Sequence, residues 1–182
     1  MSDWWASLRH GGLLLSPSKV AEFFPQGPEP LPAWLEERLR RDLARLEVEG
    51  GESRLLDTVL EQVLGLGGRA DADSGAWVKG GALSAEWTRR SITGEAVRPR
   101  RVWQGPHGAV LPVFFDDQAR RLGVGRGRRA VARMVEWLRR TEVRLGLLTN
   151  ARQFRLVHAG LDHEAWAEWD TDLWFLEGAP GL

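Results

Sequence analysis

The chain contains no cysteine among its 182 residues. Disulfides and thiolate metal sites are therefore excluded, and the composition is compatible with a cytosolic protein. Its longest apolar runs, such as residues 13–15 and 110–115, are far too short to span a bilayer. The opening stretch MSDWWASLRHGG lacks the basic region and apolar core of a signal peptide. We therefore expect a cytoplasmic location and no membrane partner.

Motifs for metal binding and nucleophilic catalysis are also scarce. His158 and His163 are five residues apart across a turn, which is not a metal-ligand spacing. No serine lies in a nucleophile elbow. Gly123, Gly125 and Gly127 alternate with other residues, but they lack the final spacing of a dinucleotide-binding fingerprint. We expect no metal site and no cofactor in this chain.

The chain does have the composition of a folded globular protein, with 43% hydrophobic and 27% charged residues. Ser16 and Pro17 predict the start of a short helix. Leucines three or four apart predict an amphipathic helix over residues 33–47 and a more deeply buried helix over residues 52–65. Residues 65–85, rich in glycine, alanine and aspartate, predict a long loop.

The second half is patterned for strands. Two short runs around a GPHG turn predict a hairpin over residues 101–115, with Pro112 at a sheet edge or a bulge. A helix is predicted over residues 128–141, and LGLLTNARQFRLVHAG (145–160) predicts a strand, a turn and a second strand. At that turn Asn150 would tolerate a positive φ.

This order of elements predicts an α/β (α+β mixed) fold, in which a mixed sheet is flanked by helices. We divide the chain into an N-terminal helical extension, residues 1–50, and an α/β domain, residues 51–182. The acidic tail of the second part contains several tryptophans and shows no clear element.

Positive charge is concentrated in one segment although the formal net charge is zero. Residues 86–144 hold 14 arginines and six carboxylates. Closely placed guanidiniums can bind phosphates and neutralise their charge. The alternative interpretation of this basic segment is a solvated protein face against which acidic segments of the same chain fold. The glycines around Arg126 favour approach of an anion to a helix N-terminus. The candidate DNA-binding residues are Arg98, Arg100, Arg101, Arg120, Arg121, Arg126, Arg128, Arg129 and Arg152.

Three stretches, LLDTVLEQVLG, VARMVEWLRR and LGLLTNARQFRLVHAG, resemble the N-terminal restriction-endonuclease-like domain of large adenine-specific DNA methyltransferases. These enzymes belong to type IIG-like restriction–modification systems and to phage-defence systems of the DISARM or BREX kind. The resemblance covers roughly residues 52–175. Ala151 stands where the family usually has glycine, and Phe154 where it usually has tryptophan.

The resemblance implies a PD-(D/E)XK nuclease-like fold, whose active site needs an acid on one strand and acid-x-lysine on the next. Neither of the two lysines, Lys19 and Lys79, follows an acid in that way. The expected position reads RRLGVGRGRR instead. Asp116, Asp117 and Glu61 are the remaining candidate acids, and a turn is the favoured interpretation of the aspartate pair. We therefore expect a degenerate nuclease fold without catalytic residues.

Methyltransferase cofactor and catalytic motifs are absent from the chain. The resemblance therefore implies that S-adenosylmethionine binds elsewhere in a parent enzyme, and whether this chain is an enzyme is left open. The first hypothesis is a non-catalytic module that positions double-stranded DNA for a methyltransferase domain or other defence-system subunits. One alternative is a protein–protein adaptor that binds its partner through Trp166, Trp169 and Trp174. The other is a live, divergent Mg²⁺-dependent nuclease.

Overall fold

The computed structural model describes residues 4–67 and 75–176. Its helices are α1 (Trp4–Ser7), α2 (Pro17–Phe23), α3 (Ala33–Ala44), α4 (Gly51–Asp57) and α5 (Gly127–Arg139). A π-helical turn, Thr58–Val63, continues α4, and short 3-10 turns cover Gly80–Ala82, Ala85–Trp87, Pro106–Gly108 and Thr171–Leu173. The strands are β1 (Arg9–Gly11), β2 (Ala76–Lys79), β3 (Arg89–Arg90), β4 (Ala96–Val97), β5 (Arg101–Gln104), β6 (Val110–Phe115), β7 (Leu145–Thr149), β8 (Gln153–Ala159) and β9 (Glu164–Asp170).

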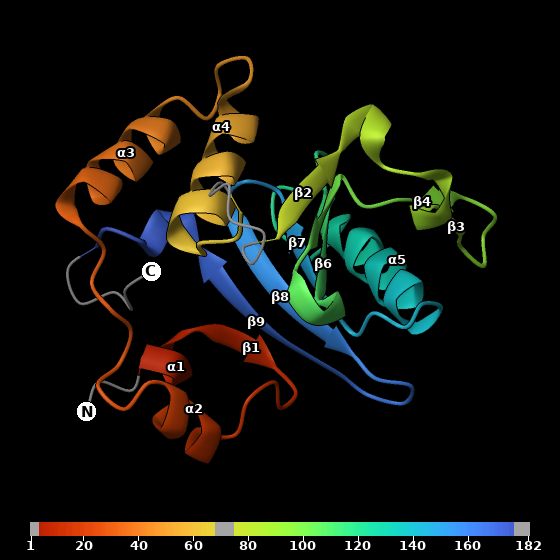
Figure 1. Ribbon diagram of the computed structural model, residues 1–182, viewed down its shortest axis with the longest axis horizontal. Helices are drawn as coiled ribbons and strands as arrows, with labels where there is room; N and C mark the ends of the chain where they lie inside the picture. Colours follow the sequence, from red (N-terminus) through yellow and green to blue (C-terminus); the bar gives the residue numbers. More distant parts are fainter. Residues whose placement is uncertain (1–3, 68–74, 177–182) are drawn as a thin grey trace.

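Seven strands form one sheet in the order β1-β9-β8-β7-β6-β5-β2, and β3 pairs with β4 in a separate ribbon. Neighbouring strands of the sheet are antiparallel except β6 and β7, which are parallel and joined through α5. Figure 1 shows α3 and α4 on one side of the sheet and α5 on the other. The predicted mixed α/β fold with flanking helices is confirmed.

Two cores lie on opposite faces of the sheet because successive strand residues point to opposite sides. Val113, Leu147 and Phe154 pack on α3 and α4, whereas Phe114 and Leu148 pack on α5. Trp137 of α5 is 1% exposed and lies edge-on to Phe114, with ring centroids 5.4 Å apart. The helical stripe expected here is buried at Met134, Val135 and Leu138, and Trp137 adds to the same buried face.

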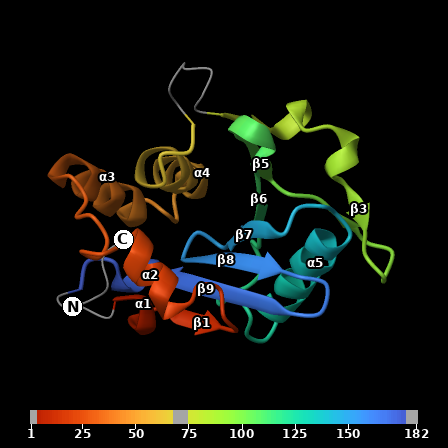
Figure 2. The same ribbon diagram turned by 60° about the horizontal axis from the view of Figure 1, so that its bottom comes forward.

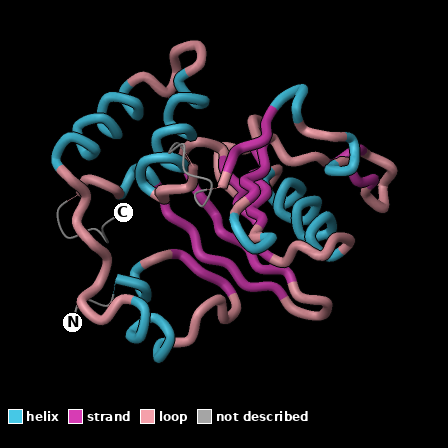
Figure 3. Tube along the Cα trace, viewed as in Figure 1, coloured by secondary structure: helices cyan, strands magenta, loops and turns pink. Residues whose placement is uncertain are grey.

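The predicted helices and hairpins are present close to their expected bounds. Ser16 caps α2 by accepting a hydrogen bond from the Lys19 amide, and Pro17 is its first residue. The strand pairs β5–β6 and β7–β8 are antiparallel, as the two hairpin patterns indicated. The secondary structure is coloured along the chain in Figure 3.

Several sequence expectations were wrong in detail. Pro112 is in an interior strand, and the strand tolerates it because pairing of β6 with β7 begins only at Val113. The positive φ at the β7–β8 turn, 66°, belongs to Ala151 rather than Asn150. The expected loop 65–85 contains strand β2, and the acidic tail contains strand β9.

The first 50 residues contribute to the same sheet and core as the remainder. Strand β1 pairs with β9 at the sheet edge, with His10 opposite Ala167. Leu35 and Leu39 of α3 are buried in the core that contains Val113 and Leu147. Figure 2 shows β1 lying beside β9. Among the described residues, no helix combines the length and apolar character that a bilayer crossing requires.

If α3 belongs to this core, Leu39→Ala should lower the free energy of unfolding by about 2–5 kcal/mol, because it leaves a cavity. Leu39 is 0% exposed. The matched control, Leu13→Ala, alters a side chain that is 72% exposed and should change stability by less than about 0.5 kcal/mol. Urea denaturation followed by circular dichroism measures both. Equal effects of the two substitutions would contradict the shared core.

Candidate anion-binding pocket

An open pocket of about 930 Å³ lies where strand β8 begins and strand β9 ends. Four of the side chains that line it are arginines, and we call it the arginine pocket. Its lining residues are Gln118, Ala119, Arg120, Arg121, Val124, Arg126, Arg152, Gln153 and Asp172.

The segment 119–127, which we call the arginine loop, connects β6 to α5 and supplies three of these arginines. Leu122 is fully buried and bridges to Gly127, so the loop closes on itself. A Cβ on Gly127 would lie 2.2 Å from the Arg121 carbonyl oxygen, which is closer than any side chain can approach. Gly123 has a φ of 70°, and a Cβ there would lie 2.5 Å from Arg155 Nη1. These two glycines therefore set the path of the loop.

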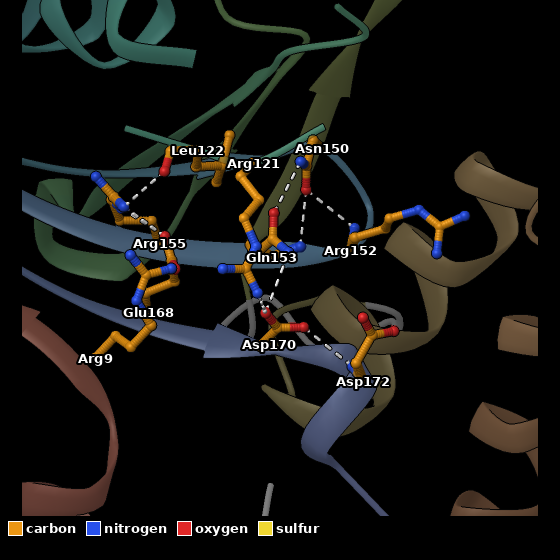
Figure 4. Close-up of polar contacts among 10 residues, drawn as sticks. All are labelled: Arg9, Arg121, Leu122, Asn150, Arg152, Gln153, Arg155, Glu168, Asp170 and Asp172. Carbon is orange, nitrogen blue, oxygen red and sulfur yellow. Dashed lines mark hydrogen bonds and ion pairs between the residues drawn. The ribbon is translucent and has the colours of Figure 1, made fainter. Parts of the chain in front are cut away.

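A hydrogen-bonded network joins the β7–β8 turn to the pocket residue Gln153, and Figure 4 shows its contacts with Asn150 and Asp170. The Asn150 side-chain oxygen accepts hydrogen bonds from the amides of Arg152 (3.1 Å) and Gln153 (2.7 Å). Its Nδ2 donates to the Ala119 carbonyl (2.9 Å) and to Gln153 Oε1 (2.9 Å). Gln153 Nε2 in turn donates to Asp170 Oδ2 (3.2 Å). Asn150 therefore fixes both the hairpin turn and the arginine loop.

The four arginines of the pocket differ in their ion pairs. Arg152 contacts Glu47, and Arg121 lies 4.0 Å from Asp170. Arg120 and Arg126 are exposed, and neither forms an ion pair with a residue that the structure describes. Asp172 is the acid in the lining, so positive charge predominates. The arrangement offers two free guanidiniums to an anion.

The arginine loop is anchored to a buried ion pair between strands β8 and β9. Arg155 Nη2 lies 2.6 Å from Glu168 Oε2, and their side chains are 4% and 0% exposed. The same Arg155 nitrogen donates to the Leu122 carbonyl (3.1 Å). Arg9 of β1 donates to the other Glu168 oxygen at 2.6 Å. Sequence reasoning missed this cluster because the acidic tail did not predict a strand.

The other arginines predicted to bind DNA are held by the protein itself. Arg98 donates to the carbonyls of Gly80 and Leu83. Arg100 donates to Ser53 Oγ (2.9 Å), and its guanidinium lies 4.4 Å from the Phe115 ring centroid. Arg101 is buried and pairs with Asp57 at 2.5 Å. These three residues therefore hold segments of this chain together.

The predicted cluster Arg126, Arg128 and Arg129 is divided by the start of α5. Arg126 lines the arginine pocket, while Arg128 is exposed on another side of the helix. Arg129 contacts Glu95. A hydrogen bond from Arg133, with the Arg129 charge nearby, holds the pKa of Glu95 below its usual value. Glu95 therefore stays charged at neutral pH, and its contacts are lost only as the pH falls through that lowered pKa.

In the part of the chain that the structure describes, none of the candidate nuclease acids forms an ion pair with a lysine: Lys19 pairs with Glu22, and Lys79 with Asp57. Asp116 follows β6 and accepts a hydrogen bond from the Gln118 amide (3.0 Å), which is a turn interaction. Asp117 is exposed in the same turn, and Glu61 lies in the π-helical turn after α4. The segment RRLGVGRGRR forms a loop and the start of a helix rather than a strand. Within residues 4–67 and 75–176, no group of three or more acids and histidines is arranged to hold a metal ion.

The tryptophans proposed to bind a partner are largely covered. Trp174 is buried and stacks on Phe154, with ring centroids 5.6 Å apart. Trp166 is partly buried beneath the Arg155 guanidinium, which lies 4.0 Å from its ring centroid. Trp169 is likewise only partly exposed on β9. Trp174 therefore belongs to the hydrophobic core that contains Phe154.

Glu168→Gln should lower the free energy of unfolding by about 3–5 kcal/mol, because it leaves Arg155 buried without a counter-charge. The matched control is Glu36→Gln, which removes one side of the exposed Glu36–Arg40 pair and should cost less than about 1 kcal/mol. Chemical denaturation of the two variants provides the measurement. A loss at Glu168 as small as that at Glu36 would show that the buried pair does not anchor the strands.

Comparison of the chain with protein-family models, curated proteins and solved structures returned no match.

Proposed function

We propose that this chain binds the phosphate backbone of DNA through the arginine pocket. In this proposal it acts as a non-catalytic positioning module of an adenine-specific DNA methyltransferase in a restriction–modification or phage-defence system. The observation that carries the proposal is the pair Arg120 and Arg126, which are exposed, free of ion pairs among the described residues and directed to one pocket. Guanidiniums bind phosphate oxygens strongly and release counterions from DNA.

The shape of the site favours an extended polyanion over a small enclosed ligand. The pocket is open, and exposed Arg128 follows two residues after Arg126 at the start of α5. The first amides of this helix donate to carbonyls of the arginine loop, so the positive charge offered to a polyanion comes from the arginine side chains. A polymer with regularly spaced phosphates can contact these arginines together, since its charges repeat along the backbone.

The order of elements supports a nuclease-like fold. Helix α4 precedes the antiparallel strands β2, β5 and β6, and a crossover through α5 leads to the parallel strand β7. In that fold the acid and the acid-x-lysine would lie on adjacent strands. Here the Arg100 amide donates to the Val113 carbonyl (2.7 Å), and the Arg100 side chain covers Phe115. Strands β5 and β6 contain neither an acid nor a lysine, and this supports a role without cleavage.

The adaptor alternative has a further candidate surface beside the partly exposed Trp166 and Trp169. The N-terminal part offers one, because Phe23 and Trp34 are 63% and 56% exposed and α2 has no buried residue. If this surface were the functional one, the chain would not bind DNA even at low salt. The methyltransferase itself, with its S-adenosylmethionine site, would be supplied by another part of the parent enzyme or by another subunit.

Replacing Arg120 and Arg126 together with alanine should weaken duplex DNA binding about equally on all sequences, because phosphate contacts carry no base information. The slope of log K against log salt should fall by roughly one unit for each lost contact. Fluorescence polarisation with labelled duplexes at several salt concentrations measures both quantities.

The matched control is the pair Arg41→Ala and Arg45→Ala. It also removes two exposed arginines, but from the α3 region. For this variant, the slope of log K against log salt should differ from the wild-type slope by less than about one unit. Identical slopes for the pocket variant and the wild type would exclude the arginine pocket as the DNA surface.

A further inference from the structure

We infer that the nucleic acid bound by this chain presents an unpaired base, which lies in a groove beside α5. This inference rests on the proposed phosphate contact. The groove measures about 770 Å³, within the range of small-ligand sites. We call it the α5 groove, and its apolar wall comprises Ile92, Val131, Ala132, Val135 and Trp166.

The α5 groove and the arginine pocket are neighbours across the arginine loop. Gly123 lines the groove, and Val124, the next residue, lines the pocket. In the same way Arg126 lines the pocket, and Arg128 lines the groove. A chain of phosphates held by Arg126 and Arg128 would therefore run between the two hollows.

The groove contains part of the half-buried Trp166 ring, which packs against the buried Arg155 guanidinium. Arg155 and Trp166 both line it, and the Arg155 guanidinium lies 4.0 Å from the Trp166 ring centroid. The ion pair with Glu168 fixes the orientation of this guanidinium. Bases stack on aromatic rings and on arginine planes, and this stacking tolerates every base.

The charges around the groove favour a nucleotide over an acidic peptide. Arg139 lies 3.8 Å from Glu164, and Arg140 lies 3.0 Å from Glu136. Both acids also line the groove, and Glu136 accepts a hydrogen bond from the Ile92 amide (2.7 Å). Arg128 is left without an ion pair among the residues that the structure describes. Because the two acids are paired with arginines, Arg128 is the unpaired charge of this described lining, and one cation beside an apolar wall matches one phosphate and one base better than several carboxylates of a peptide.

The test compares oligothymidylate with an abasic phosphodiester of the same length and charge, using fluorescence polarisation at low salt. The wild type should bind the oligothymidylate at least about fivefold more tightly, since stacking of even one base contributes that much. Ala132→Trp should fill the groove and bring this ratio close to one, while leaving affinity for the abasic polymer unchanged. Ala21→Trp, at an exposed alanine of α2, is the matched control and should keep the wild-type ratio.

A second measurement needs no variant. An oligonucleotide with one 2-aminopurine should lose fluorescence on binding the wild type, because its base becomes stacked. Equal affinity for the two polymers together with unquenched 2-aminopurine would overturn the base site and leave the phosphate proposal intact. Failure of the wild type to bind either single-stranded polymer at low salt while it still binds duplex DNA would overturn the base site alone. Failure to bind duplex DNA as well would overturn both proposals. If an acidic apolar peptide displaced the bound oligothymidylate, and the affinities for oligothymidylate and the abasic polymer were equal, the groove would be assigned to a peptide instead.

Discussion

The buried ion pair between Arg155 and Glu168 is the interaction on which the proposed site depends. The two residues face each other across strands β8 and β9. Charges so fully removed from water must be paired and hydrogen-bonded, because an isolated buried charge costs several kcal/mol. Glu168 meets this requirement with two arginines, and Arg155 meets it with Glu168 and the Leu122 carbonyl. The position of the arginine loop therefore follows from the pairing of the sheet.

This anchoring explains how a chain with zero formal charge can present a basic site. Many of its arginines bind carboxylates or carbonyls of the chain itself, as Arg98, Arg101 and Arg129 do. The anchored loop keeps Arg120 and Arg126 away from such partners and places them at one pocket. Local placement of charge, and not the total, determines where a polyanion is attracted.

The sequence predicted the elements whose patterns are local. The stripe of Met134, Val135 and Leu138 predicted α5, and the alternating strands around Asn150 predicted the β7–β8 hairpin. Strand β9 was missed because glutamate and aspartate obscure its alternation, and Glu168 is buried only because Arg155 lies opposite. That pairing depends on strand register, which no local pattern contains.

The candidate site was predicted only in part for the same reason. The high density of arginines in the sequence predicted the basic loop, including Arg120 and Arg126. It could not distinguish these two from arginines that pair with acids distant in the sequence. The Arg129–Glu95 and Arg152–Glu47 contacts span 34 and 105 residues. The hydrogen bond that joins the pocket residue Gln153 to Asp170 is likewise a tertiary contact.

The most direct test of the account observes the arginine side chains themselves while DNA is added. Nuclear magnetic resonance of the ¹⁵N-labelled protein resolves arginine Nε–Hε signals, which can be assigned by single arginine-to-lysine substitutions. We expect the Arg120 and Arg126 signals to shift with the first additions of duplex DNA, while those of buried Arg101 and Arg155 remain in place. Shifts confined to Arg41 and Arg45, or no shift of any arginine at low salt, would contradict the claim that the arginine pocket binds the phosphate backbone.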